Sequence, residues 1–255
     1  GRYCAAKVSR VDVDGARDIY DTYHGTLFLN HSAITLYPTG ETAMLSYYSL
    51  HGGMPACIPQ NLDGTAAPCP EWINLENPTP EECAAVSKDH NIPLEHIQAA
   101  LDISERPRVE HTDELILIVA RAPVKDDHNR RVPFSTCPVA VILTPTLVVT
   151  VCLKEGIVAE LLFRKIRGTG SRLGVRLVLT LLLRISTTFI DHLRLMDDRV
   201  SLIEQALQKS MQNQELIKML HIEKSLIYFL TALKGNHSVM EKIASSPNLA
   251  VSAEE

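Results

Sequence analysis

Carboxylates and histidines in a few short runs are the residues of this chain best suited to chemistry. Asp126, Asp127 and His128 are consecutive, and oxygen-rich groups so placed suit a hydrated Mg²⁺ ion. A metal-dependent hydrolase built on these three residues is therefore one hypothesis. The surrounding stretch, residues 125–131 (KDDHNRR), is more typical of an exposed charged loop, and we favour that interpretation.

Two further groups lack the pattern of a catalytic site. Asp197 and Asp198, with Glu204 beyond them, could act as acid and base, but they flank an apolar stripe and are expected on its solvated side. The histidines form no His-Glu-x-x-His motif or zinc-like pair. His90 and His96 flank predicted helices and are expected at the surface. No catalytic residue is assigned, and we do not expect an enzyme.

A glycine-containing stretch and a basic cluster lie next to each other. Gly168, Gly170 and Gly174 miss the G-x-G-x-x-G spacing by one residue, so we interpret residues 168–174 as a helix–helix linker. The cluster lacks the interleaved aromatic residues of a single-strand binder. We predict a solvated face, with contact to acidic headgroups or a neighbouring subunit as the alternative. Its members are Arg164, Lys165, Arg167, Arg172 and Arg176.

Composition and charge exclude several classes of protein. A formal net charge of −5 argues against a nucleic-acid binder. No run of 18 apolar residues occurs, so this sequence contains no predicted bilayer span, and its polar first ten residues are no signal peptide. Six cysteines without a Cys-x-x-Cys pair predict free or buried thiols in a reducing compartment. A Cys57–Cys69 disulfide is the alternative.

The elements that must position these residues begin with strands and two short helices. Residues 26–29, 34–37, 44–50 and 72–75 are strand candidates, and residues 55–70 read as loop. Thr79, Pro80 and Glu82 form a capping box with proline at the first helical position. That helix should end near His90. A second should start at Pro93, place Leu94, Ile97 and Leu101 on one face, and end before Pro107.

Three apolar runs then predict strands buried on both faces, at residues 115–120, 139–143 and 147–152. Residues 144–146 should join the last two as a hairpin. Helix is expected from Val158 up to the glycines.

Two long amphipathic helices follow, from Leu177 to Leu233, joined by a polar turn at 208–215. A short turn forces the two helices antiparallel, and Asn213 is a candidate cap for the second. The first carries an apolar stripe at Val178, Leu182, Ile185, Phe189, Leu193, Met196, Val200, Ile203 and Leu207. The second continues it at Met219, Ile222, Leu226, Phe229 and Leu233.

The predicted fold class is α/β (α+β), with a mixed sheet between helical layers, followed by a long antiparallel helical hairpin. Residues 1–43 are unassigned, either ordinary domain sequence or an extension ahead of Met44. Residues 44–170 form the α/β subdomain, 171–245 the hairpin of the same domain, and 246–255 a linker.

Several stretches in order along the chain resemble the CorA family of magnesium channels. They are residues 72–75 (WINL) with 78–82 (PTPEE), residues 101–110 (LDISERPRVE) around Arg106-Pro107, the strand pair in 139–152, and residues 209–213 (KSMQN) with 223–229 (EKSLIYF). The resemblance covers residues 44–243 and leaves 1–43 uncovered.

The resemblance implies a cytoplasmic domain of an inner-membrane protein, a homopentamer, and a following stalk that leads to two membrane helices. It implies transport of Mg²⁺, or of Co²⁺, Ni²⁺ or Zn²⁺, gated by intracellular divalent ions at subunit interfaces. The family's Gly-Met-Asn motif is absent from this chain, so we expect a sensor without its pore. No nucleic-acid partner is implied.

One departure affects the sensor. Where family members carry an acidic pair about ten residues before Arg-Pro, this chain has Gln98-Ala99. The position at which the family carries a carboxylate on the first long helix falls near Thr187-Thr188 in this chain. The metal site is therefore unknown, with Glu95, Asp102 and Glu105 as the candidate oxygen donors. The alternative function is a soluble helical-hairpin scaffold that binds a partner without an ion.

Overall fold

The computed structural model describes residues 25–30, 33–38, 44–49, 56–58, 72–112, 114–126, 132–154, 156–158, 173–209, 213–246 and 249. The chain divides into two units, Gly1–Thr42 and Ala43–Glu255. The first contains an antiparallel pair, β1 (Gly25–Asn30) and β2 (Ala33–Pro38), in which Leu27 lies opposite Leu36. The two strands predicted at 26–29 and 34–37 are therefore confirmed.

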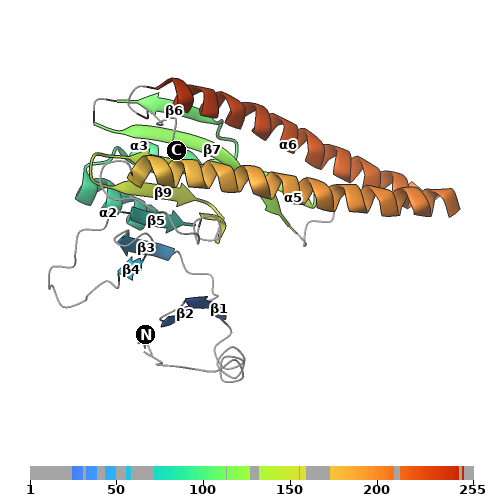
Figure 1. The fold of residues 1–255 in the computed structure, drawn as a ribbon, viewed down its shortest axis with the longest axis horizontal. Coiled ribbons are helices and arrows are strands. Elements are labelled where there is room, and N and C mark those ends of the chain that lie inside the picture. Colours follow the sequence, from blue (N-terminus) through green and yellow to red (C-terminus); the bar gives the residue numbers. More distant parts are fainter. Residues whose placement is uncertain are drawn as a thin grey trace. The chain divides into compact units, whose positions relative to one another are not determined.

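The second unit is built on a mixed sheet of the order β4-β3-β5-β9-β8-β7-β6 (Figure 1). Its strands are β3 (Met44–Ser49), β4 (Ala56–Ile58), β5 (Trp72–Glu76), β6 (Arg108–His111), β7 (Ile116–Lys125), β8 (Phe134–Leu143) and β9 (Val148–Cys152). Among the described strands of this sheet only β5 and β9 run parallel; the other neighbours are antiparallel. Strand β4 lies within the stretch predicted as loop, so that prediction was wrong for residues 56–58.

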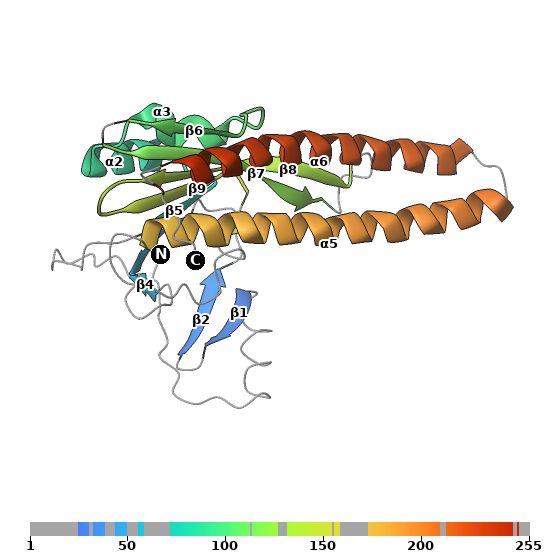
Figure 2. The same ribbon diagram turned by 45° about the horizontal axis from the view of Figure 1, so that its top comes forward.

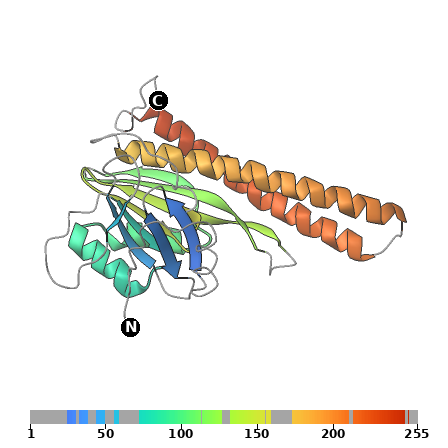
Figure 3. The same cartoon turned by 60° about the horizontal axis from the view of Figure 1, so that its bottom comes forward.

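Helical layers cover both faces of this sheet, as predicted. In β7, Ile118 and Ala120 belong to one buried cluster together with the long helices, whereas Leu117 and Val119 belong to another together with α2 and α3. Successive side chains of a strand point to opposite faces, which explains the continuous apolar runs. Figure 3 shows α2 (Pro80–His90) and the long helical hairpin on opposite faces of the sheet.

Strands β7 and β8 extend beyond the apolar runs from which they were predicted, into segments that contain a proline and polar residues. Pro138 pairs with Arg121, and Pro123 pairs with Thr136. The backbone N–H of Arg121 points away from β8, and by alternation the nitrogen of Pro123 does too. Pro138 lies opposite Arg121, so its nitrogen likewise points away from β7, toward the β9 side, where pairing begins only at Val139. Neither proline therefore removes a hydrogen bond from the β7–β8 ladder. The predicted hairpin at residues 144–146 is confirmed.

The short helices follow their capping signals. Thr79 Oγ1 accepts from the N–H of Glu82 at 3.2 Å, and Glu82 Oε2 accepts from the N–H of Thr79 at 2.8 Å, so the capping box is confirmed. The next helix is shorter than predicted: α3 spans Leu94–Gln98 and tightens into the 3₁₀ turn η1, Ala99–Leu101. Of the three residues expected on one face of this helix, Ile97 is buried and Leu101 partly buried, whereas Leu94 is 38% exposed.

The two long helices are α5 (Leu173–Lys209) and α6 (Asn213–Ser245). Both are longer than predicted, and they lie side by side and antiparallel (Figure 2). The stripe of α5 is confirmed as buried or partly buried. On α6, Leu226 is 42% exposed, so the predicted stripe was wrong at that position, because the packed face passes through the adjacent Ser225 instead. The buried residues of α6 are Ile222, Ser225, Phe229, Ala232, Asn236, Val239 and Ile243.

Gly174 lies within α5 rather than in a linker, and an added Cβ would approach Leu143 Cδ2 at 3.2 Å. The rest of the predicted linker, the helix after Val158, most of the basic cluster, residues 210–212 of the turn and Cys69 lie outside the described residues. No helix among the described residues is both long and apolar enough to cross a membrane.

Candidate functional site

The three predicted metal donors lie on or near one loop, residues 102–107, between η1 and β6. Glu95 is exposed in the first turn of α3. Asp102 Oδ1 accepts from the N–H of Ser104 at 2.8 Å, and Glu105 Oε1 accepts from the N–H of Arg106 at 2.9 Å. Two of the three candidates thus help to shape the loop that carries them.

Glu105 belongs to a small charged cluster. Arg108 Nη1 lies 2.5 Å from Glu105 Oε1, and Arg108 Nε also contacts Glu110 Oε1. His96 Nε2 lies 3.7 Å from Glu110 Oε2. One guanidinium therefore lies between two carboxylates, which partly neutralises their mutual repulsion.

The surface position predicted for His96 was wrong. The residue is only 8% exposed, and its Nδ1 is buried and forms no hydrogen bond with the described residues. It lies in α3 beside Ile97, which packs into the buried cluster between the short helices and the sheet. A histidine flanking a short helix gives no sequence signal of which side it will face.

The chain does not assemble a closed metal site from its own described side chains. No group of three His, Cys, Asp or Glu residues suited to a metal ion occurs within the described ranges. Magnesium needs few protein ligands because it keeps several waters, so Glu95, Asp102 and Glu105 remain candidate donors. A more complete shell would need donors from another chain or from other residues.

The two positions at which the family carboxylates were expected hold neutral residues with local roles. Gln98 is exposed at the end of α3, while Ala99 is buried. The hydroxyls of Thr187 and Thr188 donate to the carbonyls of Leu183 and Arg184, each at 2.9 Å, within their own helix. Neither position supplies a charge for a cation.

The rival hydrolase site is largely outside the described residues. Asp127 and His128 are not described; the N–H of Asp126 donates to the carbonyl of Pro133 at 2.9 Å. Asp197, Asp198 and Glu204 are exposed on α5, so their predicted solvated position is confirmed.

Arg121 is the residue that sequence reasoning missed. It lies in β7, and its guanidinium donates to the carbonyls of Ile103 at 3.0 Å and Glu105 at 2.7 Å. The same group donates to Thr136 Oγ1 and to the Thr136 carbonyl, each at 2.9 Å. Burial lowers the pKa of Arg121, an effect that the nearby Asp102 opposes. Arg121 therefore holds the candidate loop against the sheet; an arginine within an apolar run was the available signal.

Cys83, Cys137 and Cys152 are buried free thiols, as predicted for the cysteines of this chain. Cys137 and Cys152 lie on neighbouring strands with their Sγ atoms 3.7 Å apart. The thiol contact and burial both raise the pKa of Cys152, so it stays protonated at neutral pH. The suggested Cys57–Cys69 disulfide involves Cys69, which lies outside the described residues.

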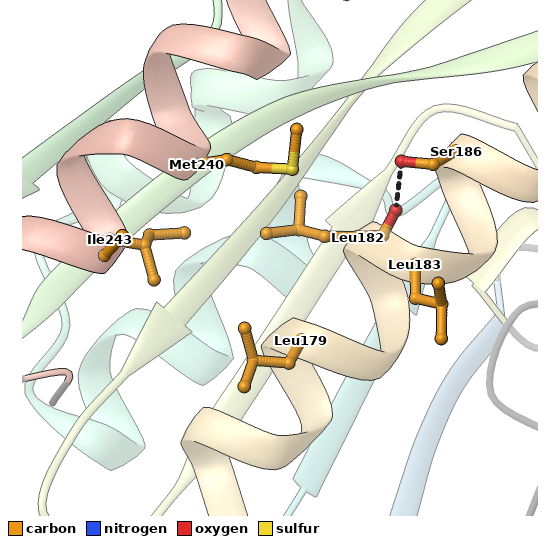
Figure 4. Close-up of a pocket in the computed structure, with 7 residues that line it drawn as sticks. Leu179, Leu182, Leu183, Ser186, Met240 and Ile243 are labelled. Atoms are coloured by element: carbon orange, nitrogen blue, oxygen red, sulfur yellow. Dashed lines mark hydrogen bonds between the residues drawn. The ribbon is translucent and has the colours of Figure 1, made fainter. Parts of the chain in front are cut away.

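A separate apolar pocket of about 280 Å³ lies between the start of α5 and the end of α6. Figure 4 shows Leu179, Leu182, Met240 and Ile243 around it. Its one hydroxyl, that of Ser186, donates to the Leu182 carbonyl at 2.9 Å. The lining thus offers apolar surface and no uncommitted polar side chain.

Known proteins with related sequences and folds are consistent with this architecture. The cobalt/magnesium transport protein CorA of Methanocaldococcus jannaschii is 25% identical over 174 residues, which are 66% of this chain and 53% of that protein. The present chain thus spans about half the length of that curated relative.

Two solved structures share the fold. The complete CorA magnesium transporter of M. jannaschii superposes with a TM-score of 0.67 at 21% identity, covering 84% of this chain and 66% of that one. The soluble domain of CorA from the same organism gives 0.65 at 22% identity, with 82% of each chain covered.

The sequence match covers most of the second unit. The model of the family described as CorA-like Mg²⁺ transporter protein matches residues 70–255, from the start of β5 through the α5–α6 hairpin. The chain therefore belongs to the CorA-like Mg²⁺ transporter family.

Proposed function

We propose that this chain is the cytoplasmic regulatory and assembly part of an inner-membrane protein that transports Mg²⁺. Other divalent ions, Co²⁺, Ni²⁺ or Zn²⁺, are alternative cargo. The protein would assemble as a homopentamer, and the pore would lie in membrane helices that follow residue 255. The role of this chain would be gating rather than catalysis.

One observation carries this proposal: the family match covers residues 70–255, from β5 through the helical hairpin. A relative that matches 66% of this chain is named as a cobalt/magnesium transport protein. Loop 102–107 gives physical support to the proposal, because its carboxylates are accessible to an ion. Asp102 is exposed, and the Glu105 side chain is 25% exposed.

In the proposed mechanism, divalent ions bind where carboxylates of neighbouring subunits approach each other. Bound ions offset the carboxylate repulsion and favour the closed arrangement, and loss of the ions shifts the population toward the open one. An ion can shift this equilibrium only through a difference in its affinity for the two states. Donors from a second subunit would complete a shell that Asp102 and Glu105 begin.

The test uses the full-length protein in liposomes with a trapped Mg²⁺ indicator. We expect influx to slow as internal Mg²⁺ rises, and the Asp102→Asn/Glu105→Gln double variant to need more internal Mg²⁺ for the same inhibition. The asparagine keeps the acceptor for Ser104. Asp197→Asn/Asp198→Asn is the matched control, since those carboxylates are exposed on α5. Influx that never depends on internal Mg²⁺ would overturn the proposal.

A partner-binding scaffold without ion transport is the second candidate, and a particular surface favours it. Leu216, Leu220, Ile227 and Leu230 are each more than half exposed on α6, and their spacing places them on one side of the helix. Sequencing the coding region beyond residue 255 separates the two functions. Two apolar runs of about 20 residues would favour transport, and a stop codon at residue 255 would favour the scaffold.

A further inference from the structure

The open edge of β7 is closed by a side chain of α6. Strand β6 pairs with β7 only as far as Val119, which lies opposite Arg108. Beyond that point the N–H of Arg121 donates to Asn236 Oδ1 at 2.8 Å, and Asn236 Nδ2 donates to the Arg121 carbonyl at 2.8 Å. Asn236 is 5% exposed. Its amide replaces the missing strand and satisfies both backbone groups.

The side chain of Arg121 holds the candidate loop. Its guanidinium donates to the carbonyls of Ile103 and Glu105, which lie in the middle of residues 102–107. Its contacts with Thr136 fix it to β8. Arg121 thus binds α6 through its backbone and the loop through its side chain, so a single residue lies between the two.

A second contact joins the same loop to the same turn of α6. A Cβ placed on Gly235 would lie 2.6 Å from Pro107 Cγ, so an ordinary side chain does not fit there without movement. Glycine inside a helix is unfavourable relative to alanine, which makes this close approach the physical reason for glycine at this position. Pro107 ends the loop, and Gly235 precedes Asn236.

We propose that Arg121 and Asn236, together with the Pro107–Gly235 contact, form a coupling junction that transmits displacement of loop 102–107 to α6. These are positioning residues, and none of them is assigned an ion. The inference deepens the proposed function, on which it rests for the identity of the ligand that moves the loop. The junction itself depends only on the contacts described.

The geometry explains why movement would be transmitted rather than absorbed. Arg121 is in a strand that is paired with β8 along its length, so its backbone has little freedom to yield. The loop carbonyls and the Asn236 amide are both hydrogen-bonded to this rigid residue. A shift of Glu105 therefore changes the Arg121 contacts and the Pro107–Gly235 contact together. Linkage requires the converse as well, so that changes in α6 alter the loop.

The first experiment measures hydrogen exchange of the loop amides in the 255-residue protein. Asn236→Ala removes both bonds to Arg121 without touching the loop. We expect exchange at Ser104, Glu105 and Arg106 to accelerate about tenfold or more, because two partly buried hydrogen bonds are lost. Ser225→Ala is the matched control: Ser225 is also buried on α6, but its hydroxyl donates only to the His221 carbonyl of its own helix. Unchanged loop exchange in Asn236→Ala, or equal acceleration in the control, would overturn the junction.

A second variant keeps the test informative if Asn236→Ala fails to fold. Glu105→Gln weakens the Arg108 pair at the loop, and NMR can follow the side-chain amide of Asn236. We expect its resonances to shift, whereas Asp191→Asn, which weakens the exposed Asp191–Arg194 pair on α5, should leave them in place. Equal shifts in the two variants, or none in either, would contradict coupling.

Mg²⁺ separates the junction from the proposed function. Both proposals are supported if Mg²⁺ slows loop exchange and shifts the Asn236 resonances in the wild type, whereas in an Arg121→Lys variant it slows loop exchange but leaves the Asn236 resonances in place. If Mg²⁺ has no effect while Asn236→Ala still frees the loop, the regulatory function fails and the junction stands. If Mg²⁺ slows loop exchange while Asn236→Ala leaves the loop unchanged, the junction fails and the regulatory function stands.

Discussion

The indole Nε1 of Trp72 donates a hydrogen bond to the hydroxyl of Thr150 at 2.9 Å, across the only parallel strand pair among the described residues. Thr150 in turn donates to Asn74 Oδ1 at 2.7 Å. All three side chains are at most 2% exposed. This polar chain ties β5 to β9 at a place where water cannot replace a lost partner.

We expect Thr150→Val to lower the free energy of unfolding by roughly 1–3 kcal/mol, because it removes the buried hydroxyl that accepts from the Trp72 N–H and donates to the Asn74 oxygen. Urea denaturation followed by the fluorescence of Trp72, the single tryptophan of the chain, measures the change. Thr187→Val on the exposed face of α5 is the control and should stay within about 0.5 kcal/mol. A Thr150 variant as stable as the wild type would show that the bond carries no net stability.

The capping box of α2 allows a second prediction. Thr79→Ala should reduce stability by about 0.5–2 kcal/mol, because the N–H of Glu82 loses its acceptor. Glu82→Gln should cost less, since glutamine can still accept from the N–H of Thr79. Chemical denaturation of the three proteins checks this order. The reverse order would mean that the negative charge at the helix start, rather than the hydroxyl cap, carries the stabilisation.

Local signals explain how much of the fold the sequence could reveal. Thr79, Pro80 and Glu82 are neighbours in the chain, so the start of α2 was predicted correctly. Strand β7 was ended too early because Arg121 and Pro123 interrupt its apolar run, whereas pairing with β8 continues regardless. Long-range pairing overrides local pattern at such points.

The candidate site was harder to predict because its contacts use backbone atoms. The carbonyls of Ile103 and Glu105 accept from Arg121, and no side-chain motif encodes a carbonyl acceptor. Asn236 is 115 residues from Arg121 in sequence. Its helix was predicted from large apolar residues, so the stripe was drawn through Leu226 rather than through the Asn236 face.

The aromatic contact at the centre of the hairpin gives a stability prediction. Phe229 packs edge-on against Phe189, with ring centroids 4.8 Å apart, and against Phe134 at 6.4 Å. Phe229→Ala should cost about 3–5 kcal/mol. Leu230→Ala, the adjacent residue at 55% exposure, should change stability by less than about 0.5 kcal/mol. Thermal or urea unfolding distinguishes the two, and similar costs would contradict the assigned packed face of α6.

His192 should make stability depend on pH. Its ring lies 5.5 Å from the Phe134 ring and stacks on Phe229 at 6.3 Å. Its Nδ1 is buried and forms no hydrogen bond with the described residues. Burial lowers the pKa of His192, the charge of Lys125 lowers it further, and Asp191 opposes the shift.

Because the folded-state pKa of His192 lies below the unfolded value of about 6.5, the unfolded chain binds the proton first as the pH falls. The contribution of His192 is therefore fully present above about pH 6.5 and is lost as the pH drops from there through the folded pKa. His192→Gln cannot take up this proton, so its urea midpoint should fall less steeply between about pH 7.5 and 5.5. His237→Gln, on an exposed histidine of α6, should retain the wild-type slope. If His192→Gln keeps that slope too, other groups cause the acid sensitivity, and the hairpin core tolerates a charged imidazole.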